Sequence, residues 1–180
     1  MKRSALFAAV ALVLLPAMAQ AGSIGIGGYG GMSIPIVQDD NGNGPVFGAR
    51  APVALNKLLT VEPYFASTSA GDAELEIGGI NYTRDGLDAT GFGANVMLTF
   101  GDRVKFYPFG GYGSSTLTRD GSADVTMTGF NYGIGLGISP IEKLTIHLRG
   151  EGNTYSKDDA GRTFGIVTVG VSYDLFPILQ

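Results

Sequence analysis

The chain has 180 residues, of which 44% are hydrophobic and 16% charged, with 12 basic residues against 16 acidic ones and no cysteine. This length suits one domain, the acidic balance argues against a nucleic-acid partner, and the lack of cysteine excludes a disulfide framework and argues against a lipoprotein anchor. The 29 glycines do not follow the G-x-y period of collagen, so they favour a crowded β structure.

The first 21 residues predict a secretory signal peptide. Lys2 and Arg3 form its positive region, residues 5–15 form an apolar run too short for a transmembrane helix, and Ala19-Gln20-Ala21 offers a cleavage site. We therefore expect an exported mature domain over residues 22–180. Without Lys2 and Arg3, ten basic residues face sixteen acidic ones, a net charge of −6, and no later apolar run is long enough to span a membrane as a helix.

The rest of the chain shows the two-residue period of β-strands. In residues 128–138, for example, Phe130, Ile134 and Leu136 share one face while glycine and asparagine occupy the other. Residues 104–117 carry aromatic side chains on both parities, so their two faces stay unassigned. The eight predicted strands are residues 22–34, 47–53, 58–68, 92–100, 104–117, 128–138, 144–153 and 163–176.

The connections between these strands alternate in length. Long polar loops are predicted over residues 35–45, 69–89, 118–125 and 156–162, and short turns over residues 56–57, 101–102 and 139–142. Most of residues 69–89 are expected to be loop, with the ends extending the flanking strands. An even number of strands with alternating long and short connections is the pattern of an outer-membrane β-barrel.

The polar face of the strands decides between a soluble sandwich and a barrel in lipid. That face carries mainly glycine, serine, threonine and asparagine, whereas lysine and glutamate concentrate in the loops. A soluble surface would carry more charge. The apolar faces are therefore predicted to point outward into lipid, where a closed barrel satisfies every backbone hydrogen bond.

The last predicted strand, residues 163–176, alternates apolar and small residues and ends in Tyr173, Leu175 and Phe176. With the leader and the eight-strand pattern, it makes the mature chain resemble the OmpA and OmpX type of outer-membrane barrel. The resemblance implies an all-β, eight-stranded antiparallel up-and-down transmembrane barrel in a Gram-negative outer membrane. It also implies an assembly signal that the barrel-assembly machinery reads, formed by Val171, Tyr173, Leu175 and Phe176. Here the parity puts Leu175 at the family's usual aromatic position, and residues 177–180 follow where the family usually ends.

Charged and amide side chains on the polar face are predicted to meet inside the barrel, because eight strands leave an interior just wide enough for side chains. They form either a structural plug of ion pairs or a narrow gated pore, in which Arg149 or Arg50 faces Glu62 or Glu151. The predicted luminal network is Arg50, Glu62, Asn95, Asn131, His147, Arg149 and Glu151.

An acyl-modifying enzyme is the third possibility. Small barrels of that kind use a histidine with a serine and an acid near the lipid-facing rim. His147 is the sole histidine here, but Arg149 stands where the deacylase family has a serine, and the alternation points His147 inward. We therefore predict a hydrogen-bonding role for His147 and no catalytic residue.

No motif predicts a cofactor or a metal site. Residues 39–44 match the opening of a calcium loop, but its twelfth position is Arg50 instead of glutamate. The glycine runs precede no helix, as a phosphate site would require. The acidic residues of the second long loop are either simply solvated or recruit divalent cations at the lipopolysaccharide surface. The sequence thus predicts a non-enzymatic barrel with a structural or adhesion-like role, whose partners are outer-membrane lipid, lipopolysaccharide and an extracellular ligand of the loops.

Overall fold

The computed structural model describes residues 22–37, 42–77, 79–84, 86–119, 121–157 and 160–176. The predicted signal peptide therefore lies outside the described residues. Within these ranges, no helix is long and apolar enough to cross a membrane. The strands are β1 (Ser23–Val37), β2 (Gly44–Arg50), β3 (Val53–Ala54), β4 (Leu59–Ala70), β5 (Ala73–Ile77), β6 (Ile80–Arg84), β7 (Leu87–Leu98), β8 (Val104–Thr118), β9 (Val125–Ile141), β10 (Leu144–Lys157) and β11 (Ala160–Phe176).

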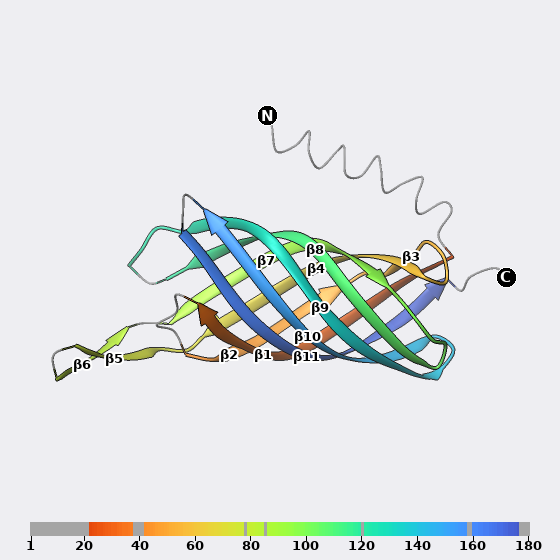
Figure 1. Cartoon of the computed structure of the whole chain (residues 1–180), viewed down its shortest axis with the longest axis horizontal. Coiled ribbons are helices and arrows are strands. Elements are labelled where there is room, and N and C mark those ends of the chain that lie inside the picture. The colour runs from red at the N-terminus through yellow and green to blue at the C-terminus, as the bar shows by residue number, and fades with distance from the viewer. Residues whose placement is uncertain are drawn as a thin grey trace, which may run out of the picture.

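One antiparallel sheet closes on itself to form the barrel wall (Figure 1). Closure comes from the pairing of β1 with β11, which runs from Ile24 opposite Phe176 to Val37 opposite Thr163. The short strands β2 and β3 both lie between β1 and β4, so together they act as one wall strand. The predicted fold class, a closed eight-stranded antiparallel barrel, is confirmed.

The two ends of the barrel differ. The short connections at residues 55–58, 99–103 and 142–143 lie at one end together with Ser23 and Phe176, and we name it the turn end (Figure 1). The other connections leave the opposite, loop end, at residues 38–43, 71–86, 119–124 and 158–159. The prediction of a long loop over residues 156–162 was wrong, because Lys157 of β10 pairs directly with Ala160 of β11. In the first short turn the Asn56 side-chain oxygen accepts hydrogen bonds from the backbone amides of Leu58 and Leu59, at 2.9 and 2.8 Å. Such an Asn turn explains the tight connection.

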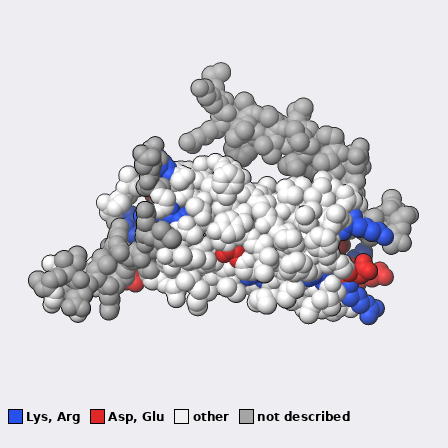
Figure 2. Space-filling view, viewed as in Figure 1, with Lys and Arg blue, Asp and Glu red and all other residues white. Residues whose placement is uncertain are grey.

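The apolar side chains of the wall face outward, as the pattern predicts. Phe130 in β9 is 66% exposed, and Val169 in β11 is 57% exposed. The charged side chains gather toward the two ends, and the middle of the visible surface is largely uncharged (Figure 2). The barrel therefore presents an apolar belt between two polar ends.

The structure assigns the two faces of β8, which the sequence left open. Tyr107 and Phe109 are buried in the lumen, whereas Phe106 and Tyr112 are exposed outside. Tyr107 pairs directly with Gly135 of β9, and a Cβ atom added there would overlap the Tyr107 ring. A glycine on the neighbouring strand thus makes room for the ring inside a narrow barrel.

The second long loop is more ordered than expected. Residues 73–77 and 80–84 form the hairpin β5–β6, which projects beyond the loop end (Figure 1). The expectation that most of residues 69–89 are loop was therefore wrong. Gly79 sits in the hairpin turn with a φ of 81°, a conformation that glycine adopts without strain. The alternation in A-E-L-E-I, followed by two glycines, was the sequence signal for this hairpin.

Candidate functional site

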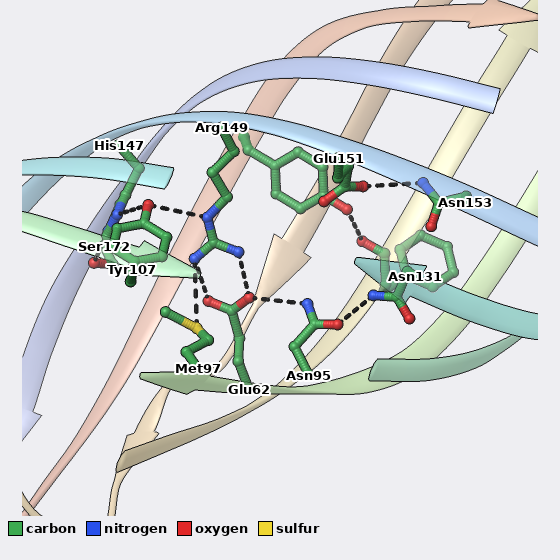
Figure 3. A network of polar contacts seen from close by, with 12 residues as sticks. Glu62, Asn95, Met97, Tyr107, Asn131, His147, Arg149, Glu151, Asn153 and Ser172 are labelled. Carbon is green, nitrogen blue, oxygen red and sulfur yellow. Dashed lines mark hydrogen bonds and ion pairs between the residues drawn. The ribbon is translucent and has the colours of Figure 1, made fainter. Parts of the chain in front are cut away.

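A buried ion pair crosses the centre of the lumen. Arg149 of β10 binds Glu62 of β4 through two parallel contacts, Nη1 to Oε1 at 2.6 Å and Nη2 to Oε2 at 2.7 Å (Figure 3). Each side chain is 1% exposed. This bidentate geometry is the strong form of a charge-assisted hydrogen bond, and it ties opposite walls of the barrel together.

Two asparagines extend the network on the carboxylate side. The Asn95 amide nitrogen donates to Glu62 Oε1 at 3.4 Å, and the Asn131 amide nitrogen donates to Asn95 Oδ1 (Figure 3). A carboxylate only accepts hydrogen bonds, so Glu62 sets the orientation of Asn95. Asn95 in turn sets the orientation of Asn131.

A second chain of contacts leads from the guanidinium to β11. Arg149 Nε donates to the Tyr107 hydroxyl at 3.1 Å, which lies 2.8 Å from His147 Nδ1 (Figure 3). His147 Nε2 lies 2.7 Å from Ser172 Oγ. If Tyr107 donates its hydroxyl hydrogen to Nδ1, His147 carries its ring hydrogen on Nε2 and donates it to Ser172.

All seven residues of the predicted luminal set point into the lumen, but they do not form one network. Glu62, Asn95, Asn131, His147 and Arg149 are connected as described above. Arg50 instead stacks on the Tyr29 ring, with its guanidinium carbon 4.0 Å from the ring centre. Glu151 accepts a hydrogen bond from Asn153 at 3.2 Å. Within the described residues, neither Arg50 nor Glu151 has an ion-pair partner within 4.0 Å.

Sequence reasoning missed three members of the network: Tyr107, Ser172 and Met97. Met97 contacts Arg149 Nη2 through its sulfur at 3.8 Å. Tyr107 was missed because the faces of β8 were unassigned. Ser172 has the inward parity of β11, and this parity was the available signal. The serine that the acyl-enzyme hypothesis requires beside His147 therefore exists, but on the neighbouring strand.

This serine–histidine pair is poorly arranged for catalysis at the lipid boundary. Ser172 and His147 are buried inside the barrel, away from the lipid-facing surface. With Nε2 as donor, Ser172 accepts a hydrogen bond and is not deprotonated by the imidazole, which nucleophilic attack would require. The pair instead extends the hydrogen-bond network of the ion pair.

The lumen differs along its length. At the turn end a cavity of about 1130 Å³ opens outward, and Glu62, Tyr107, His147 and Ser172 are among its lining residues. At the loop end the interior holds a cluster of buried apolar side chains, which we name the apolar layer: Ala70, Leu87, Leu117 and Met127. The ion-pair network lies between the two.

The residues of the predicted assembly signal lie at the turn end of β11. Val171, Tyr173 and Leu175 are exposed on the outer face, and Phe176 is exposed at the end of the strand. The segment 39–41 of the calcium-like motif lies outside the described residues.

Comparison with known proteins places this geometry in a family. The family model described as the outer membrane protein beta-barrel domain matches residues 5–174. No curated protein matches the chain.

Solved structures of small barrels are similar in fold. The outer membrane protein OprG of Pseudomonas aeruginosa superposes with a TM-score of 0.63 at 9% identity, covering 87% of this chain and 98% of its own. The N-terminal β-barrel domain of OprF from the same organism gives a TM-score of 0.58 at 15% identity, covering 86% and 98%. Ail of Yersinia pestis gives a TM-score of 0.51 at 19% identity, covering 85% and 97%. The chain therefore belongs to the outer membrane protein β-barrel domain family and is a protein of the bacterial outer membrane.

Proposed function

We propose that this protein is a non-enzymatic outer-membrane barrel with a structural or surface-interaction role. The observation that carries the proposal is the closure of the lumen by side chains. The bidentate Arg149–Glu62 pair fills the centre, and the apolar layer fills the loop end. An interior packed in this way offers solutes no open path, so we expect the protein to act through its outer surfaces.

The hairpin β5–β6 is the surface that we propose for contact with an extracellular ligand. In this family the long loops face the cell exterior, and the hairpin projects from that end (Figure 1). Its two strands pair only with each other among the described residues. Unpaired strand edges offer backbone donors and acceptors to another chain. Asn81, Tyr82 and Thr83 add exposed side chains.

The proposed membrane partners follow from the apolar belt and from β11. The belt would contact lipid and, in the outer leaflet, lipopolysaccharide. Ail, a structurally similar barrel, has been solved in a phospholipid bilayer nanodisc and in complex with the heparin analogue sucrose octasulfate. We further propose that Val171, Tyr173, Leu175 and Phe176 serve as the signal for the barrel-assembly machinery.

The test is single-channel recording of the refolded mature protein in a planar bilayer, with folding verified by heat-shifted gel migration. We expect no discrete openings, because the ion pair and the apolar layer both obstruct the lumen. Regular openings from the wild-type protein would contradict the proposal.

A narrow gated pore is the second candidate, and one observation favours it. The turn-end cavity reaches Glu62, so only the ion-pair network and the apolar layer separate this water-accessible space from the loop end. A pore of this kind predicts openings whose conductance changes in Arg149→Ala. Absence of openings in both the wild-type protein and Arg149→Ala would rule out the gated pore.

A further inference from the structure

Arg50 is a buried cation with unused donors. Its side chain is 5% exposed, and its Nε and Nη1 atoms have no hydrogen-bond acceptor among the described residues. The Tyr29 ring lies 4.0 Å from the guanidinium carbon and stabilises the charge, but a ring face does not replace the in-plane acceptors of Nε and Nη1.

Asn131 is a buried amide with an unused acceptor. It is 3% exposed, and its Oδ1 atom has no donor among the described residues. The orientation of this amide is set by the chain from Glu62 through Asn95, in which each nitrogen must donate. The free Oδ1 is therefore a consequence of the ion-pair network.

The two side chains line the same small cavity. It lies at the centre of the lumen, and its wall also holds Tyr29, Glu62, Tyr64, Asn95, Arg149 and Glu151. The Tyr64 hydroxyl is a third buried group in this wall without a hydrogen-bond partner among the described residues. The centre of a water-sized sphere can reach about 10 Å³ of it. That is the space that one water molecule needs in a protein interior.

We propose that this cavity is a binding site for one structural water molecule that bridges Arg50 and Asn131. A water oxygen accepts from the Arg50 guanidinium while a water hydrogen is donated to Asn131 Oδ1. The Arg50 and Asn131 groups are both satisfied by this single guest, and its second hydrogen is left for the Tyr64 hydroxyl.

The chemistry of the wall favours water over a halide or a metal ion as the guest. An anion would accept from Arg50, but it has no hydrogen for Asn131 Oδ1. The wall holds the guanidinium groups of Arg50 and Arg149 and the carboxylates of Glu62 and Glu151, so its formal charges balance. A cation would be repelled by the neighbouring Arg50 guanidinium. Neither a cation nor an anion would neutralise a net formal charge of the wall.

Two measurements on the full mature protein test the site. In a high-resolution crystal structure from bromide-containing solution, we expect one oxygen-sized peak within hydrogen-bond distance of Arg50 and Asn131, without anomalous signal. Anomalous bromide density there would assign the site to an anion and overturn the proposal. An empty cavity, or a direct contact between Arg50 and Glu151, would also overturn it.

In solution, NMR magnetisation transfer from water to the Arg50 Nε hydrogen reports the same water in detergent micelles. We expect a cross-peak in the wild-type protein and its loss in Asn131→Leu, which removes the acceptor. Asn153→Leu is the matched control, since Asn153 is an equally buried luminal amide that does not line the cavity, and it should keep the cross-peak. Absence of the cross-peak from the folded wild-type protein would count against the site, whatever the variants do.

Discussion

At the residue scale, the Arg149–Glu62 pair holds two charges on side chains with almost no exposed surface. Both groups are fully buried, and the guanidinium also binds Tyr107. Removing one partner of such a pair leaves the other charge buried and uncompensated, at a typical cost of about 3–5 kcal/mol. Removing one partner is thus expected to cost more stability than replacing both partners with uncharged residues.

We expect Arg149→Met to lower the unfolding free energy by about 3 kcal/mol or more. In the double variant Glu62→Gln with Arg149→Met, part of this loss should be recovered because no charge remains unpaired. Urea unfolding in micelles measures both. The control is Lys157→Met, an exposed basic residue of the same strand, which should change stability by no more than about 0.5 kcal/mol. A loss in the double variant larger than in Arg149→Met would contradict this account.

At the scale of the elements, β8 and β9 fit together through a ring placed against glycine. Tyr107 and Phe109 of β8 lie opposite Gly135 and Gly133 of β9. Because Tyr107 is 1% exposed and hydrogen-bonded to Arg149 and His147, its ring has little room to move. The glycine therefore contributes to the position of the whole luminal network.

We expect Gly135→Ala to destabilise the barrel by about 1–3 kcal/mol through overpacking. It should also broaden or shift the NMR signals of His147, which depends on Tyr107. Gly150→Ala is the matched control on β10, because an added Cβ atom there meets nothing within 4 Å. Equal behaviour of the two variants would show that the ring against Gly135 is not under steric constraint.

At the scale of the whole molecule, the barrel and the hairpin β5–β6 are separate β structures. Among the described residues, the two hairpin strands belong to a sheet of their own. Its base is narrow, since the Gly86 backbone amide donates to the Asp72 side chain at 2.8 Å. The hairpin can therefore be removed without spanning a wide gap in the wall.

We expect replacement of residues 73–84 by Gly-Ser-Gly to leave the heat-shifted gel migration and the urea midpoint of the barrel unchanged. Leu87→Ser, a single change in the apolar layer just past the hairpin, should instead lower the urea midpoint, because a buried apolar side chain is lost. Measuring the attachment of cells that display each variant then separates the contribution of the hairpin to binding from that of the barrel. Under the proposed function the hairpin replacement loses attachment, and unchanged attachment would move the binding surface elsewhere.

Much of the architecture could be predicted from the alternation of residues. Phe130, Ile134 and Leu136 have the parity that the structure places outside, and Asn131 has the parity that it places inside. This works because successive side chains of a strand must point to opposite faces. The hairpin was missed because its strands are short and lie within a polar loop, although its alternation was visible.

The sequence by itself therefore determined the eight strands of the wall, the two ends and the inward parity of the predicted luminal residues, since these depend only on local periodicity and turn chemistry. Only the tertiary structure decided which of those residues meet. Closure and strand register bring Arg149 against Glu62 across the barrel, set His147 beside Ser172, and leave Arg50 on Tyr29. Closure of the barrel also decides which face of β8 points into the lumen, and it brings the residues of the apolar layer together at the loop end. Such contacts join residues far apart in the chain, and parity within one strand carries no information about the strand across the lumen.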